Sequence, residues 1–137
     1  MAARTKARKR ALDLLFEAEA RGLNLGELLQ QRLAEPVTPA PLSPYTAALV
    51  DGVVAHWRDI NELLSTYSQG WALERMPAVD RAILRLGAFE ILYGDDVPAP
   101  VAISEAVALA SQLSTDDSPK FVGGLLGRLA QVKPTLA

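Results

Sequence analysis

The chain has 137 residues, half of them hydrophobic, which suits one globular domain that buries a core without disulfides. It has no cysteine, so thiolate chemistry is excluded, and no apolar run reaches the roughly 20 residues of a membrane span. The net charge is −2, yet residues 1–10 carry five basic and no acidic side chains, which leaves nine basic against sixteen acidic residues, or −7, elsewhere. We expect a cytoplasmic protein whose basic N-terminus meets a polyanion, or else forms a disordered tail.

The first predicted helix covers Arg4 to Ala20 and should end at Gly22. It carries one apolar stripe at helical spacing, made of Ala7, Ala11, Leu14, Leu15 and Ala18. Outside this stripe, Thr5, Lys9, Leu12 and Phe16 project together. Cations beside an outward aromatic ring suit single-stranded nucleic acid, because they neutralise phosphates while an unstacked base lies on the ring. The alternatives are a Phe16 packed in the core and a membrane-surface helix, which acidic residues on the polar face disfavour.

Six more short helices follow in chain order, and no segment alternates like a β-strand. They are expected at about Leu25–Leu33, Pro44–His56 with Ser43 as N-cap, Asp59–Tyr67 with Asp59 as N-cap, from Pro77 in the first turn to about Tyr93, from after the prolines at 98 and 100 to about Leu113, and from Ser118 as N-cap to about Val132. The inward residues of the second helix are predicted to include Leu33, and those of the sixth to include Leu113. The fold class is therefore all-α, with about seven short helices.

No pattern of residues supports catalysis. His56 is the only histidine, so no zinc site can be completed, and we predict neither a metal nor a cofactor. Gly123, Gly124 and Gly127 follow no strand and are interpreted as allowing close helix approach rather than binding phosphate. Glu90 lies near an apolar face and needs donors, either from an arginine or from the end of a neighbouring helix. The protein is not expected to be an enzyme.

Three segments in register resemble the family of the bacterial transcription antitermination factor NusB. They are residues 3–19 (ARTKARKRALDLLFEAE), residues 79–110 (VDRAILRLGAFEILYGDDVPAPVAISEAVALA) and residues 114–129 (STDDSPKFVGGLLGRL). The resemblance implies one domain over residues 1–137, built from two small packed bundles at about 1–56 and 58–132. It also implies binding of boxA RNA together with the small-subunit ribosomal protein NusE, in a complex that suppresses termination by RNA polymerase, notably in ribosomal RNA operons.

The resemblance also implies which residues bind. By position, the RNA surface would comprise Arg4, Lys6, Arg8, Lys9 and Phe16 near the N-terminus, and Asp117, Ser118, Lys120 and Phe121 near the C-terminus. The surface for the ribosomal protein would include Glu74 and Asp80. The family usually has asparagine where Gly123 stands, so a polar contact there is not expected.

The sequence leaves two other functions and one oligomeric state open. The chain could be a helical adaptor that binds only proteins, or the N-terminal RNA-positioning domain of a ribosomal RNA cytosine methyltransferase. The basic helix could also be covered by a second copy of the chain in a homodimer.

Overall fold

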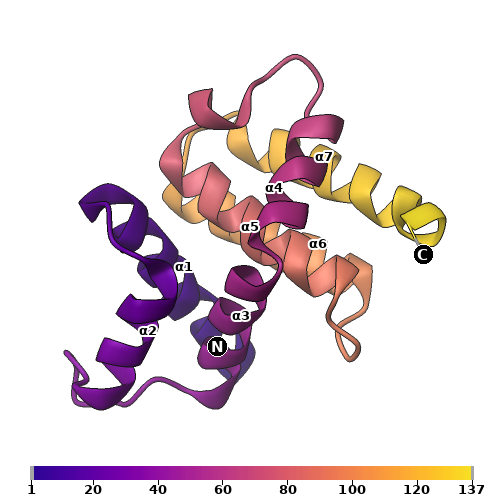
Figure 1. Cartoon of the computed structure of the whole chain (residues 1–137). Helices are drawn as coiled ribbons and strands as arrows, with labels where there is room; N and C mark the ends of the chain where they lie inside the picture. The colour runs from indigo at the N-terminus through magenta and orange to yellow at the C-terminus, as the bar shows by residue number, and fades with distance from the viewer. Residues whose placement is uncertain (1, 137) are drawn as a thin grey trace.

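The computed structural model describes residues 2–136, and every regular element in that range is helical (Figure 1). The seven α-helices are α1 (Ala3–Arg21), α2 (Leu25–Ala34), α3 (Pro44–Ala55), α4 (Trp57–Tyr67), α5 (Ala78–Leu92), α6 (Ala99–Leu113) and α7 (Ser118–Val132). Two short 3-10 segments, η1 (Leu73–Arg75) and η2 (Lys133–Leu136), complete the list. The predicted all-α fold class with about seven helices is confirmed.

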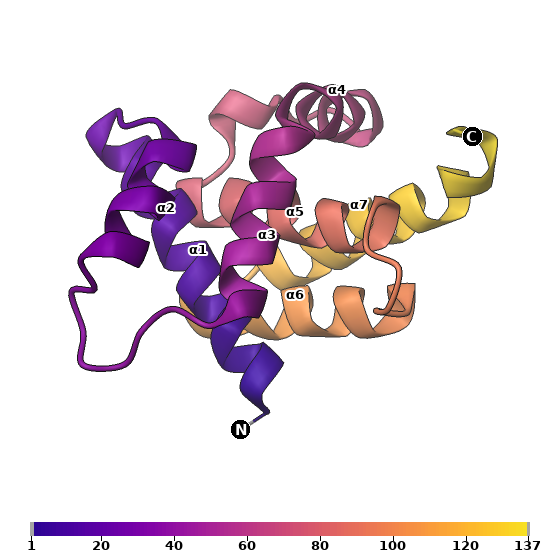
Figure 2. The ribbon, with the colours of Figure 1, turned by 60° about the horizontal axis from the view of Figure 1, so that its bottom comes forward.

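The helices pack in two groups that share one hydrophobic core. Helices α1, α2 and α3 pack on one another, and α4 to α7 form the second group (Figures 1 and 2). Helix α5 joins them, because it contacts α6 and α7 on one side and α1 and α3 on the other. Its buried positions are correspondingly numerous, and only one continuous apolar cluster fills the space between the described helices.

Local capping explains several helix boundaries. The Ser43 hydroxyl accepts a hydrogen bond from the Thr46 N–H at 3.1 Å, and Pro44 occupies the first turn of α3. Helix α1 ends as predicted at Gly22, whose φ of 65° is left-handed and whose N–H reaches the carbonyls of the last turn.

Two predicted N-caps are wrong. Asp117, not Ser118, precedes α7, and Ser118 is the first helical residue, where its hydroxyl serves tertiary contacts. Helix α4 begins at Trp57, directly after His56, so Asp59 lies in its first turn. The His56 ring stacks on Tyr93 with centroids 3.7 Å apart, which fixes the bend between α3 and α4.

The predicted inward faces hold for the long helices and fail at some ends. All five residues of the α1 stripe are at most 5% exposed. Leu33 and Leu113, which were expected inside, are 42% and 40% exposed because they lie in the last turns of α2 and α6. Leu12 was expected to project outward with Phe16 but is 3% exposed, because the buried face of α1 is wider than the predicted stripe.

Glycines allow close helix approach at two positions that the sequence did not single out. A Cβ on Gly52 would overlap the Phe89 ring, and one on Gly87 would lie 2.6 Å from a methyl carbon of Leu126. Of the three glycines that were expected to do this in α7, Gly123 is tight, with Val107 at 3.1 Å from an added Cβ. The expectation is wrong for Gly127, around which an added Cβ would meet nothing within 4 Å.

Among residues 2–136, every helix is too short or too polar to cross a membrane.

Candidate nucleic-acid interface

The outer face of α1 presents an exposed aromatic ring, Phe16, with Lys9 about two turns and Lys6 about three turns before it. Phe16 is 42% exposed, so the ring is not part of the core. Lys6 is exposed and makes no ion pair with any residue in the 2–136 range. Lys9 pairs with Asp13 one turn later at 2.7 Å, and both side chains remain about half exposed. Exposed pairs of this kind are worth about 0–1 kcal/mol, so a phosphate can replace the carboxylate at little cost.

Arg4 lies near the start of α1 on the side that faces α3, not on the side of Phe16. Its guanidinium pairs with Asp96 at 2.7 Å and lies over the Tyr45 ring, 4.5 Å from the centroid. The hydrogen bond from Arg4 lowers the pKa of the Asp96 carboxyl and raises that of the guanidinium, so both stay charged at neutral pH. The pair is solvent-exposed, and Arg4 is therefore also available to an incoming anion.

Arg8 is not part of this exposed face. Its side chain is 5% exposed and donates to both oxygens of Glu90 at 2.8 Å, while its remaining nitrogen reaches Glu105 at 2.8 Å. The hydroxyl of Tyr45 donates to Glu90 at 2.6 Å, and Thr5 donates to Glu105 at 2.5 Å. This buried network ties α1 to α3, α5 and α6. The predicted phosphate contact for Arg8 is thus corrected to an internal ion pair, and the predicted arginine partner for Glu90 is confirmed.

Burial and charge together set the protonation of the network. Burial alone would lower the pKa of Arg8, but the hydrogen bond and charge of Glu90, with smaller effects of Tyr45 and Glu105, raise it. Burial raises the pKa of Tyr45 to about 12, and the acceptor Glu90 adds to the rise. The hydrogen bonds between Arg8 and Glu90 fix the rotation of α1 that turns Lys9 and Phe16 outward.

The corner between α6 and α7 carries the second set of predicted RNA residues. Asp117 and Lys120 are exposed there, and Phe121 is partly buried. Ser118 is 1% exposed, because its hydroxyl donates to Asp80 at 2.9 Å. Ser118 therefore shapes the corner from inside and does not offer its hydroxyl to a ligand.

Asp80 is buried as well. It is 0% exposed, and its second oxygen accepts a hydrogen bond from Ser114 at 2.6 Å. Its predicted place on the surface for the ribosomal protein is corrected, because the buried carboxylate accepts hydrogen bonds from the hydroxyls of Ser114 and Ser118 at the α6–α7 corner. Glu74, the other residue predicted for that surface, is exposed in η1.

Arg81 connects the two sets of residues. Its guanidinium pairs with Glu19, near the end of α1, with Nε to Oε1 at 3.0 Å. The same side chain donates to the backbone carbonyls of Leu73 and Glu74 at 3.3 Å, and to that of Met76. Because Arg81 follows Asp80 in the first turn of α5, the end of α1, the η1 segment and the α6–α7 corner all meet around that turn.

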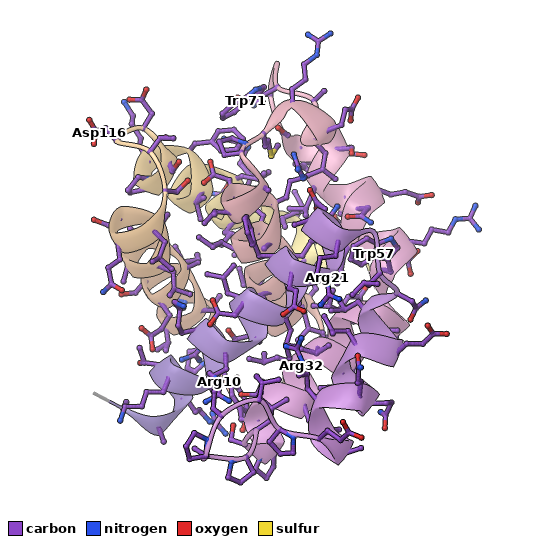
Figure 3. All side chains as sticks on the ribbon, turned by 90° about the vertical axis from the view of Figure 1, so that its left-hand side faces the viewer. Arg10, Arg21, Arg32, Trp57, Trp71 and Asp116 are labelled. Atoms are coloured by element: carbon purple, nitrogen blue, oxygen red, sulfur yellow. The ribbon has the colours of Figure 1, made fainter. Side chains whose placement is uncertain are left out.

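The structure adds Trp71 to the α6–α7 corner. Its ring meets that of Phe121 edge to face, with centroids 4.8 Å apart and planes at 67°. In Figure 3, Trp71 lies at the same end of the molecule as Asp116, whereas Trp57 lies across α1 from Asp116. Sequence reasoning missed Trp71, because it comes from an irregular segment with no helical period to place it.

Comparison with known proteins identifies the family to which this arrangement belongs. The model of the NusB family matches residues 5–131. The chain belongs to the NusB family. A transcription antitermination protein NusB of Arthrobacter sp. (strain FB24) is 60% identical over 136 residues, which cover 99% of this chain and 98% of that protein. Another, of Nocardioides sp. (strain JS614), is 58% identical over the full length of both.

Solved structures of NusB agree in fold. The NusB of T. maritima superposes with a TM-score of 0.81 at 32% identity, covering 95% of this chain and 92% of that one. A chain in the crystal structure of antitermination factors NusB and NusE in complex with double-stranded RNA superposes with a TM-score of 0.79 at 26% identity, covering 94% and 96%. The name shared by the sequence relatives of this NusB family member describes a transcription factor, which confirms the prediction of a protein that is not an enzyme.

Proposed function

We propose that this NusB family member is a cytoplasmic transcription antitermination factor that binds boxA-type single-stranded RNA together with the ribosomal protein NusE, within the antitermination complex on RNA polymerase. The observation that carries the RNA part is the ordered outer face of α1, where Phe16 is 42% exposed and Lys9 and Lys6 precede it by about two and three turns. The ring would accept a splayed base, and the cations would neutralise phosphates on the side of the helix start.

The binding residues that we propose are fewer than the sequence predicted. Arg4, Lys6, Lys9 and Phe16 contribute from α1, and Asp117, Lys120 and Phe121 from the α6–α7 corner. The residues that the structure buries, Arg8, Ser118 and Asp80, act by holding these two regions in place. The first turn of α5 joins the regions, which supports one continuous RNA path across them.

The net charge of the chain and its similarity to a solved complex both support binding of the ribosomal protein NusE. Outside residues 1–10 the chain carries a net charge of −7, which suits a basic ribosomal protein, and Glu74 is an exposed carboxylate next to the α5 start. The superposable chain in the crystal structure with NusE and RNA has the same helical fold.

Fluorescence anisotropy of a labelled boxA-type RNA at several salt concentrations tests the proposal, with and without NusE. Affinity should fall linearly on logarithmic axes, by a slope of about −0.7 per phosphate contacted. Lys6→Ala and Lys9→Ala should each flatten the slope by about 0.7. Arg58→Ala is the matched control, because Arg58 is an 89% exposed cation on α4, outside the proposed path, and the slope should stay unchanged.

Phe16→Ala tests the stacking role. It should weaken RNA binding about 5- to 100-fold, the effect of losing one stacked base, and leave the salt slope unchanged. If the variant binds RNA normally but loses NusE, the ring contacts the protein partner instead. If the unmodified protein binds no RNA at low salt, with or without NusE, the alternative of a protein-only adaptor is favoured.

A further inference from the structure

Trp71 lies outside the segments that predicted a binding role, yet its ring packs against Phe121 at the α6–α7 corner. It belongs to the irregular segment between α4 and α5, which crosses the top of the second helix group in Figure 1. Both rings are only partly buried, and the next residue before Phe121 is the exposed Lys120. Two aromatic rings and a cation thus stand together at one corner.

The segment that carries Trp71 is held rigidly from both sides. The Ser68 hydroxyl donates to the Trp71 carbonyl at 2.6 Å, and Arg128 of α7 donates to the carbonyl of Tyr67 at 3.0 Å. After Trp71, the buried side chains of Leu73 and Met76 anchor the chain in the core. A ring that is ordered before binding loses little conformational freedom when a ligand stacks on it, which favours binding.

The geometry of the pair leaves ring surface that the partner ring does not stack on. In an edge-to-face pair, the edge of one ring points at the face of the other. The two rings therefore do not stack on each other, and the ring that contributes its edge keeps both faces free of its partner. Stacking of bases on aromatic rings beside a cation is the common way to hold single-stranded RNA, since every base has a flat face. Trp71 packs against the core but, unlike the neighbouring Leu73 and Met76, keeps part of its ring exposed.

We propose that Trp71 is a nucleobase contact: together with Phe121 it forms an aromatic platform on which an unpaired base of the RNA stacks, while Lys120 neutralises an adjoining phosphate. This inference rests on the proposed RNA-binding function and extends it to a residue outside the three motifs from which binding residues were predicted.

The chain has two tryptophans, so single-tryptophan variants separate the two environments. Trp57→Phe leaves Trp71 as the reporter at the platform. Trp71→Phe leaves Trp57, which lies over the Arg85 guanidinium at 4.3 Å and across α1 from Asp116 (Figure 3). On titration with boxA-type RNA, Trp71 emission should be quenched and should saturate at the Kd that anisotropy gives. Trp57 emission should stay constant in the same titration.

Substitution at Trp71 measures the energetic effect. Trp71→Leu should weaken RNA binding about 5- to 100-fold at an unchanged salt slope, whereas Trp71→Phe, which keeps a stacking ring, should weaken it about threefold or less. Trp57→Leu is the control and should bind RNA as the unmodified protein does. Urea unfolding of each variant confirms that the comparison is made on folded protein.

A direct contact is distinguished from mere support of Phe121 by photocrosslinking. RNA with 5-bromouridine in place of uridine should crosslink to Trp71 on irradiation, as peptide mass spectrometry would identify. If the protein binds RNA but Trp71 emission does not change and no crosslink forms at this residue, the inference is overturned and the proposed function is left intact. Absence of RNA binding by the unmodified protein overturns both.

Discussion

The buried ion pair between Arg8 and Glu90 permits a prediction that separates structural from RNA-binding cations. Arg8→Met removes a guanidinium that donates to Glu90 and Glu105 at 2.8 Å, and leaves Glu90, 3% exposed, with only the Tyr45 hydroxyl as partner. Breaking a buried pair by removing one partner costs about 3–5 kcal/mol. For a chain of this length that corresponds to a fall in Tm of ~10–20 °C.

Urea unfolding at pH 7 measures this loss, and a double-mutant cycle assigns it to the pair. Glu90→Gln in the Arg8→Met background removes the unpaired charge, so the double variant should recover to within about 2 kcal/mol of the unmodified protein. A loss below about 1 kcal/mol for Arg8→Met, or simple additivity of the two substitutions, would refute our interpretation of the network.

The matched control is Lys9→Met on the same helix. Lys9 is 42% exposed and pairs only with Asp13, so its loss should change stability by less than about 1 kcal/mol. In RNA binding the order of the two effects should be reversed. Lys9→Met should flatten the salt dependence of the affinity, whereas folded Arg8→Met should leave it unchanged. A flattened slope for Arg8→Met would mean that Arg8 reaches a phosphate after all.

Three more predictions concern packing and pH. Gly52→Ala should destabilise the protein by about 1–3 kcal/mol in urea unfolding, because its Cβ would overlap the Phe89 ring; an unchanged midpoint would show that the ring moves aside freely. Gly127→Ala should raise stability by about 0.5–1 kcal/mol, since its Cβ meets nothing within 4 Å; any loss contradicts the open space there. Because burial and Glu90 raise the pKa of Tyr45 from 10.0 to about 12, the stability that its proton confers is complete below pH 10 and lost from pH 10 to 12. Tyr45→Phe should make the free energy of unfolding nearly independent of pH between pH 10 and 12. If the pH dependence of stability is the same with and without this substitution, another group causes the loss.

The corrections at the site share one cause. Arg8, Ser118 and Asp80 were predicted to contact ligands, and all three are buried and hydrogen-bonded within the protein. They follow the family motif in sequence, but they contribute by holding the exposed residues in position. This division explains how a basic helix can both pack into the core and present cations outward.

The sequence by itself determined the helices, the α1 stripe and the family. Helix periodicity is local, as are the caps at Ser43 and Gly22, so the sequence order suffices to read them. The angle of Phe16 on α1 left both an exposed ring and a core ring open, and the structure decides for exposure. The three motifs that resemble the NusB family are likewise contiguous in the chain.

Only the tertiary structure decided which charged side chains are exposed and which are paired inside the protein. Arg8 and Lys9 are neighbours of the same sign, yet Arg8 finds carboxylates 82 and 97 residues away on α5 and α6, and Lys9 meets only Asp13. No local pattern encodes such distant partners. The same holds for Trp71, which reaches Phe121 of α7 only because the intervening helices α5 and α6 fold back on each other. Burial of a charge depends on what other segments bring to it, and that is a property of the packed molecule.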